Sequence, residues 1–248
     1  MSAIGIGLIV LVCVFGGALL GMVLHTILPE HHLSADSKDV IKLGMGLTAT
    51  MSALVLALLT NSAKGSFDTQ RNELTQMAAN IILLDRVLAH YGPETKEARD
   101  LLKETVANII NRMWPEGGSA PLLEPLAAEA FYDKIQSLSP QNEVQRALQG
   151  QALKMAVDIG QVRWLLFEQG GRSIPMPFLV LLIFWVTIIF LSFGLFAPRN
   201  ATVIVTLFLC ALSLSGAIFL IMELDHPFGG LVQISSASLR SALSQIDK

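Results

Sequence analysis

Residues 43–63 read LGMGLTATMSALVLALLTNSA and carry no charged side chain, although Lys42 and Lys64 bracket them directly. These 21 residues are enough to cross a bilayer as an α-helix. Side chains on a helix repeat every 3.6 residues, so this helix would have two unlike faces. A face of small and polar side chains in a spanning helix predicts contact with protein or water rather than with lipid. In this helix the small and polar face comprises Gly46, Thr50, Ala53, Ala57, Thr60, Asn61 and Lys64.

Three further windows lack Asp, Glu, Lys and Arg, namely residues 2–28, 173–198 and 200–222. Each is about as long as a transmembrane helix requires. The chain is 52% hydrophobic and only 15% charged, with a mean hydropathy of +0.57. These features predict an all-α membrane protein with four transmembrane helices.

The expected spans form two pairs, and a polar insert separates the pairs. The first pair occupies residues 1–63, with spans at about 3–28 and 42–63, and the second occupies 173–223, with spans at about 174–197 and 200–222. The insert, 64–172, holds 12 of the 17 Lys and Arg residues and 14 of the 20 Asp and Glu residues. We therefore expect it to fold in water, followed by a C-terminal tail at 224–248.

The insert is expected to be a helical bundle, because no alternating pattern of a β-strand occurs in it. A continuation of the second span should run to His90, where Tyr91-Gly92-Pro93 follows. The next helix should begin at Thr95 as an N-cap and stop before Pro115. Two more helices are expected at 122–138 and 141–169. Residues 29–41 are expected to form the loop between the first two spans.

The distribution of Lys and Arg predicts the orientation of the chain. Four spans place the N-terminus, the insert and the tail on one side, which carries five basic residues near the membrane against three on the other. Positive charge favours the cytoplasmic side. The insert and both termini are therefore predicted to be cytoplasmic, with the spans in the cell (inner) membrane.

Several functional classes are excluded or disfavoured. The sequence carries none of the common catalytic motifs, so we expect no enzyme and no cofactor. A net charge of −3 does not fit nucleic-acid binding. The histidines at 25, 31 and 32 lack further ligands for a metal, and the two cysteines, Cys13 and Cys210, lie within expected spans. Gly17 and Gly21 of the first span match a small-x-x-x-small pattern and predict close helix packing.

The small and polar face of the second span allows two interpretations. It could pack against the other three spans, as small residues often do. Alternatively, it could line a water-filled pore on the symmetry axis of an oligomer, because four spans enclose little by themselves. The same face continues through Lys64, Asp68 and Arg71, which would place one helix of roughly 45 residues across the membrane and beyond it.

A second group of residues follows the fourth span. Glu223 and Asp225 lie at a helix C-terminus, where the helix dipole disfavours negative charge. We therefore expect one of them to pair with a cation, for which Lys64, Arg71 and Arg172 are the candidates. Residues 235–248 are expected to form a short amphipathic helix. The complete group after the span is Glu223, Asp225, Pro227, Phe228 and Gly229.

These residues carry a resemblance to a known family. The segments NSAKGSFDTQR at 61–71, APRN at 197–200 and ELDHPFGG at 223–230 resemble the bestrophin-like domain of unknown function. The acidic-Pro-Phe-Gly stretch is also similar to that of bacterial bestrophins. Bestrophins are homopentameric, mostly anion-selective channels with four spans per subunit, so the resemblance implies a pore along the second span.

Two differences from bestrophins limit which of their properties the resemblance implies for this chain. The pore-facing positions here are small, whereas bestrophins narrow their pore with bulky apolar side chains. The family's acidic calcium-binding run is replaced by Gly230-Leu-Val-Gln-Ile-Ser235, so calcium gating is not implied.

The sequence thus predicts a homo-oligomeric channel for anions, embedded in the lipid bilayer, and the resemblance implies that the oligomer is a pentamer. Its pore would be lined by Gly46, Thr50, Ala53, Ala57 and Asn61, with Lys64, Asp68 and Arg71 at the cytoplasmic mouth. One alternative is a membrane-anchored helical sensor or assembly protein without a pore, and another is a transporter. The side of the membrane on which residue 120 lies would discriminate between the channel and the sensor.

Overall fold

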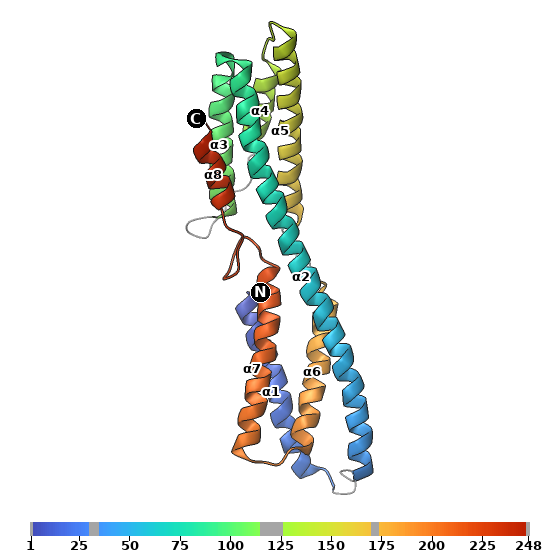
Figure 1. Cartoon of the computed structure of the whole chain (residues 1–248). Helices are drawn as coiled ribbons and strands as arrows, with labels where there is room; N and C mark the ends of the chain where they lie inside the picture. The colour runs from blue at the N-terminus through green and yellow to red at the C-terminus, as the bar shows by residue number, and fades with distance from the viewer. Residues whose placement is uncertain (1, 30–34, 115–125, 170–173, 247–248) are drawn as a thin grey trace. The chain divides into compact units, whose positions relative to one another are not determined.

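The structure, a computed structural model, describes residues 2–29, 35–114, 126–169 and 174–246. These residues are helical apart from short connections, and they include no β-strand (Figure 1). In chain order the helices are α1 (Ala3–Ile27), α2 (Ala35–Tyr91), the 3-10 turn η2 (Pro93–Thr95), α3 (Lys96–Met113), α4 (Leu126–Gln136), α5 (Glu143–Gln169), α6 (Met176–Phe196), α7 (Ala201–Leu224) and α8 (Ala237–Gln245).

Four of these helices are long and apolar enough to cross a membrane, namely α1, α2, α6 and α7. They correspond to the four charge-free windows, which confirms the all-α membrane fold. Only residues 197–200 separate α6 from α7, and Asn200 caps α7. The Asn200 side-chain oxygen accepts a hydrogen bond from the Val203 amide at 2.9 Å, which satisfies one of the free N–H groups of the first turn.

The helix α2 is longer than the sequence suggested. Its 57 residues run without interruption from Ala35 to Tyr91, whereas we expected a loop up to residue 41. Nothing in residues 35–41 breaks a helix, since they contain neither Pro nor Gly. The helix ends where predicted, and Gly92 follows with a positive φ of 140°.

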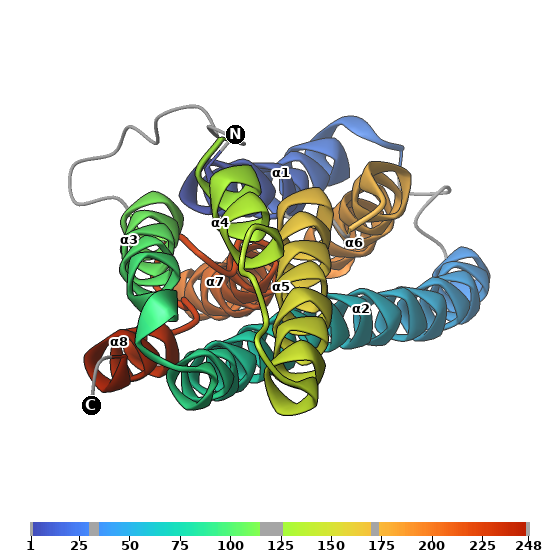
Figure 2. The same ribbon diagram turned by 90° about the horizontal axis from the view of Figure 1, so that it is seen from above.

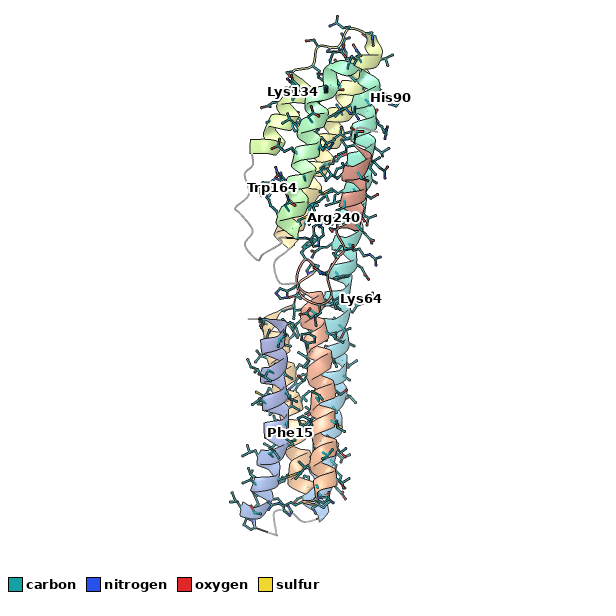
Figure 3. The ribbon with its side chains drawn as sticks, turned by 90° about the vertical axis from the view of Figure 1, so that its left-hand side faces the viewer. Phe15, Lys64, His90, Lys134, Trp164 and Arg240 are labelled. Atoms are coloured by element: carbon teal, nitrogen blue, oxygen red, sulfur yellow. The ribbon has the colours of Figure 1, made fainter. Side chains whose placement is uncertain are left out.

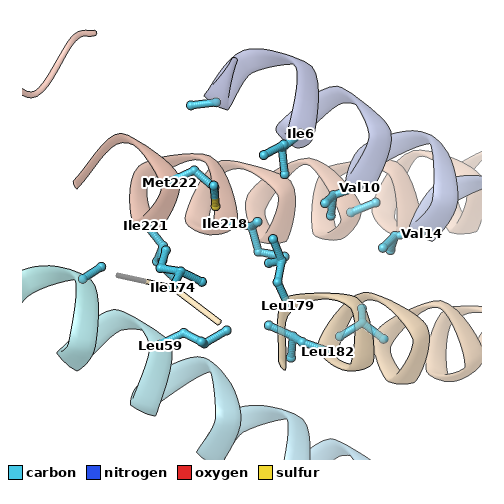
Figure 4. Close-up of a cluster of buried hydrophobic side chains, with 14 of the residues drawn as sticks. Ile6, Val10, Val14, Leu59, Ile174, Leu179, Leu182, Ile218, Ile221 and Met222 are labelled. Carbon is cyan, nitrogen blue, oxygen red and sulfur yellow. The ribbon is translucent and has the colours of Figure 1, made fainter. Parts of the chain in front are cut away.

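The chain divides into two compact units. Unit 1 comprises Met1–Phe67 and Arg172–His226, and unit 2 comprises Asp68–Gly171 and Pro227–Lys248. The core of unit 1 is made by apolar side chains from all four spans, including Val10 of α1, Leu59 of α2, Leu182 of α6 and Ile218 of α7 (Figure 4). Because only one face of each helix enters this core, the remaining faces stay exposed in the single chain.

The helices α1 and α6 lie in backbone contact within unit 1. A Cβ atom added at Gly21 would overlap the backbone of Leu191, and one added at Gly194 would overlap the backbone carbonyl of Ala18. A Cβ at Gly17 would also press on Thr187. The expected packing role of the first-span glycines is therefore confirmed, and Gly194 is the reciprocal glycine on the facing helix.

Polar contacts also fix α1 within unit 1. The Ser215 hydroxyl of α7 donates to the Gly7 carbonyl at 2.6 Å, in a buried position. The Arg199 guanidinium, in the turn before α7, donates to the carbonyl of Met22 near the end of α1. A carbonyl oxygen has two lone pairs, so the Met22 carbonyl can accept this bond in addition to the one within the helix.

Unit 2 is a helical bundle that contains the C-terminal half of α2 together with α3, α4, α5 and α8 (Figure 2). A buried ion pair joins α2 to α3. Asp85, whose side chain is 1% exposed, accepts two hydrogen bonds from Arg99, at 2.7 and 3.1 Å. On the surface, Lys134 of α4 pairs with Glu97 of α3, and this hydrogen bond and charge lower the pKa of Glu97.

Of three local expectations, one needs correction, one lies partly outside the described residues, and one is confirmed. Thr95 occupies the N-cap position of α3, but its hydroxyl donates to the carbonyls of Leu88 and Gly92 and does not cap the helix. The helix expected at 122–138 is described only over Leu126–Gln136, and residues 122–125 lie outside the described part. The expected tail helix is present as α8, with Leu239, Ala242 and Ile246 buried.

Candidate functional site

The candidate pore-facing surface lies along the first half of α2. Its five members are all exposed in the single chain, and a Cβ atom at Gly46 would meet nothing within 4 Å. They are Gly46, Thr50, Ala53, Ala57 and Asn61. They share one face of the helix because their spacings of three and four residues return to nearly the same angle. We call this face the α2 stripe.

The side of α2 that packs into unit 1 is a different one. Ser52, Leu59 and Ala63 are its buried residues in the span, at 6%, 2% and 0% exposure. Leu59 follows Ala57 by two residues, which corresponds to about 200° around the helix axis. The α2 stripe therefore faces away from the core of its own unit. This geometry disfavours the interpretation that its small residues pack against the other three spans of the same chain.

A third face of α2 is strongly apolar and exposed. Leu47, Met51, Leu54 and Leu58 are 48–71% exposed. Met51 follows Thr50 by one residue, so its side chain points about 100° away from the α2 stripe. An apolar face beside a small and polar face suits a helix that touches apolar groups on one side and water on the other.

The hydroxyls on this side of α2, that of Thr50 in the α2 stripe and that of Thr60 beside it, are already engaged with the helix itself. Thr50 donates to the Leu47 carbonyl and Thr60 donates to the Leu56 carbonyl, both at 2.8 Å. Such bonds satisfy the donor and leave the oxygen lone pairs directed outward. The stripe is therefore stable in an apolar surrounding and can still accept hydrogen bonds from water.

Charged residues continue the same face of α2 beyond the span. Lys64 and Arg71 are exposed and Asp68 is half-buried (Figure 3 labels Lys64). At the other end, Asp39 and Lys42 form an ion pair with 3.3 Å between Oδ1 and Nζ, and both are largely exposed. We did not expect this ion pair, because we assigned residues 29–41 to a loop. In the structure α2 begins at Ala35, and Asp39 then lies on the same side of the helix as the α2 stripe. The absence of Pro and Gly from residues 35–41 was the signal in the sequence for an earlier helix start.

The group after the fourth span divides between the two units. The helix α7 ends at Leu224, and Asp225 is its C-cap. Glu223 and Asp225 are both buried, at 6% exposure each. Their expected pairing with Lys64, Arg71 or Arg172 stays a prediction, and Arg172 lies outside the described residues.

The second part of this group forms a closed loop in unit 2. The Ile234 amide donates to the Pro227 carbonyl at 2.7 Å, and Gly230 between them has a positive φ of 83°. Trp114 holds the loop: its Nε1 donates to the Ile234 carbonyl at 2.9 Å, and its ring meets Phe228 edge-on at 5.7 Å. Sequence reasoning missed Trp114, because a residue 120 positions away shows no periodic relation to the loop.

We expect Trp114→Phe to loosen this loop and α8. The phenyl ring can keep the contact with Phe228, but the hydrogen bond to Ile234 is lost, which costs about 1 kcal/mol. Amide hydrogen exchange of residues 231–246 should therefore become roughly fivefold faster. Trp185→Phe, on α6, serves as the control. Equal exchange in both variants would show that the hydrogen bond contributes nothing to holding the tail.

Comparison with known proteins assigns the chain to a family. A family model described as the Bestrophin-like domain matches residues 12–239. No curated protein matches the chain in sequence. The fold resembles crystal structures of a bacterial bestrophin homolog from Klebsiella pneumoniae. One gives a TM-score of 0.63 over 93% of this chain and 96% of that one, and a tryptophan-to-alanine variant gives 0.66 over 99% and 97%, each at 14% identity. Since the family model covers most of its length, the chain belongs to the Bestrophin-like domain family.

Proposed function

We propose that the protein is a homo-oligomeric ion channel, a pentamer in the cell (inner) membrane, in which α2 lines the pore. The observation that carries the proposal is the exposure of the α2 stripe on the side of the helix opposite its own core. Copies arranged around a symmetry axis can turn these stripes toward one another and enclose a path. Membership of the Bestrophin-like family supports a channel of this kind.

The size of the stripe side chains bears on the width of the pore. The narrowest part of a pore depends on which side chains point toward its axis. Gly46, Ala53 and Ala57 project at most one methyl group, so a pore along this stripe would be wide unless another segment narrows it. The Thr50 and Asn61 side chains would supply the polar contacts for ions that keep part of their water.

The charges along α2 favour anions at one mouth. Lys64 and Arg71 follow the stripe on the side expected to be cytoplasmic, and a ring of such cations concentrates anions by electrostatic focusing. Asp68 lies between them and reduces the net charge. At the opposite end the Asp39–Lys42 pair is neutral in sum, so the Lys64 side supplies the main selectivity.

Substitution in the stripe tests the pore assignment. We expect Thr50→Trp to reduce the conductance of protein reconstituted in planar bilayers at least tenfold, because the indole would fill the path. Met51→Trp is the matched control: it places the same side chain about 100° around α2, on the exposed apolar face, and should leave conductance unchanged. Equal conductance in Thr50→Trp and the wild type would contradict the assignment.

Reversal of charge tests the selectivity. Lys64→Glu should shift the reversal potential in a salt gradient toward that of a cation-permeable channel, because the ring of charges at the mouth changes sign. Glu143→Lys, an exposed change on α5, is the control for overall charge. Labelling of a cysteine at the exposed Lys154 from either side of the membrane locates the insert. An outward location would instead favour the membrane-anchored sensor.

A further inference from the structure

The outer face of α5 carries a shallow, exposed apolar depression in unit 2, which we call the groove. Its walls are Val157, Trp164 and Leu165, which are 44%, 54% and 48% exposed, together with Gln161 and Gly160 (Figure 3 labels Trp164). Positions 157, 160, 161 and 164 are spaced i, i+3, i+4 and i+7. Four residues at this spacing form the hole that receives one side chain from a facing helix in knobs-into-holes packing.

Gly160 leaves open space at the centre of this hole. A Cβ atom added at Gly160 would meet nothing within 4 Å, so no side chain fills the space above it. Gly160 also lines a cavity of about 50 Å³ inside the bundle, together with Ile81 of α2 and Thr105 of α3. The hole therefore accepts a branched apolar side chain without moving the backbone of α5.

A side chain of that kind projects from α2 in the same unit. Leu83 is 56% exposed and lies on an exposed face with Gln76 and Ala79. Ile81, two residues earlier, points about 160° away and lines the internal cavity. Leu83 thus faces outward on α2, as the groove does on α5, and the two cannot meet within one chain.

The internal cavity indicates that Leu83 of α2 and the groove on α5 lie at the same height along the bundle. Ile81 and Gly160 line one small cavity, so they lie at nearly the same height along the bundle. Leu83 is displaced from Ile81 by only about 3 Å along α2. Rotation about an axis parallel to α2 does not shift copies along that axis. In a ring with such an axis, Leu83 of one copy reaches the height of the groove on the next.

We propose that a second copy of this chain occupies the groove, with its Leu83 inserted into the hole formed by Val157, Gly160, Gln161 and Trp164. This rests on the proposed function, since a ring with α2 near its axis provides the required symmetry. The contact joins two different surfaces, which is the kind of interface that generates closed rings. It assigns unit 2, as well as the spans, a part in assembly.

Cross-linking in membranes tests the contact directly. Cys13 and Cys210 are replaced by Ser, and Leu83→Cys is combined with Gln161→Cys. A short bis-maleimide should then give a ladder of covalent dimers and larger species on denaturing gels. Each single cysteine alone should give none. The matched control pairs Leu83→Cys with Val144→Cys, which is 68% exposed on α5 but about 25 Å further along the helix from residue 161.

Filling the hole gives an independent readout. Gly160→Leu should lower the fraction of assembled protein by at least tenfold on dilution in detergent, measured by native mass spectrometry. Gly150→Leu is the control, because a Cβ there also meets nothing within 4 Å and lies on the same helix. Both variants should keep the wild-type helical content, since leucine favours a helix over glycine.

The outcomes separate this inference from the proposed function. If the protein assembles and conducts but gives no Leu83–Gln161 ladder, the inference is overturned and the channel stands. If the protein is monomeric throughout, both are overturned. A cross-link only to another protein, or only within one chain, also overturns it.

Discussion

Asp85→Ala is expected to destabilise unit 2 by about 3 kcal/mol, because it leaves the Arg99 guanidinium without its buried carboxylate partner. Asp85 is 1% exposed and accepts both hydrogen bonds of a bidentate pair, so water cannot replace it easily. The measurement is thermal unfolding of the full chain in detergent, followed by circular dichroism. The lost helical signal should appear at a clearly lower temperature than in the wild type.

The control for this variant is an ion pair on the surface. Arg146 and Glu143 form one on α5 with side chains 66% and 85% exposed, and Glu143→Ala should cost less than about 1 kcal/mol. The double change Asp85→Leu with Arg99→Met should recover much of the stability, because a well-packed apolar pair avoids burying charge. If Asp85→Ala and Glu143→Ala unfold at the same temperature, the buried pair is not a stabilising element.

Gly194→Leu is expected to have a comparable or larger effect on unit 1. Even the Cβ atom would overlap the backbone carbonyl of Ala18, and backbone cannot rotate aside as a side chain can. The helices α1 and α6 would have to separate, which exposes their packed faces and costs about 3 kcal/mol or more. Gly21→Leu should act in the same way from the other helix, because its Cβ would overlap Leu191.

Gly16→Leu provides the matched control on α1. A Cβ at Gly16 meets nothing within 4 Å, and the position is exposed, so leucine there should be tolerated. The measurement is the fraction of expressed protein that elutes as a folded species from size-exclusion chromatography in detergent. Recovery of Gly194→Leu at the level of Gly16→Leu would mean that α1 and α6 are not in backbone contact.

The sequence was most informative where one physical requirement dominates. Spanning a membrane requires about 20 apolar residues, and the four charge-free windows therefore predicted which four helices are long and apolar. Gly17 and Gly21 predicted close packing because small residues are the usual means of helix approach in lipid. Periodicity alone could not name their partner helix, since α6 begins more than 150 residues later.

The candidate site was less predictable because its decisive features depend on which helix faces are covered. The repeat of small residues from Gly46 to Asn61 identified a face, but not that Leu59 and Ala63 would pack on the other side. Asp39 was assigned to a loop because the charged segment before the span was taken as its boundary, although no helix-breaking residue lies there. Trp114 and the loop at 227–234 meet only through the tertiary fold.

The contact between α1 and α6 has a consequence for how the protein is made. Gly21 leaves the ribosome about 170 residues before Gly194, so at 5–20 residues per second α1 waits roughly 9 to 35 s for its partner. During that time the glycine-lined face of α1 is open to lipid, to α2 or to the insertion machinery. Unit 1 cannot close until synthesis has passed residues 68–171, so the order of translation places the closure of unit 1 after the emergence of most of unit 2.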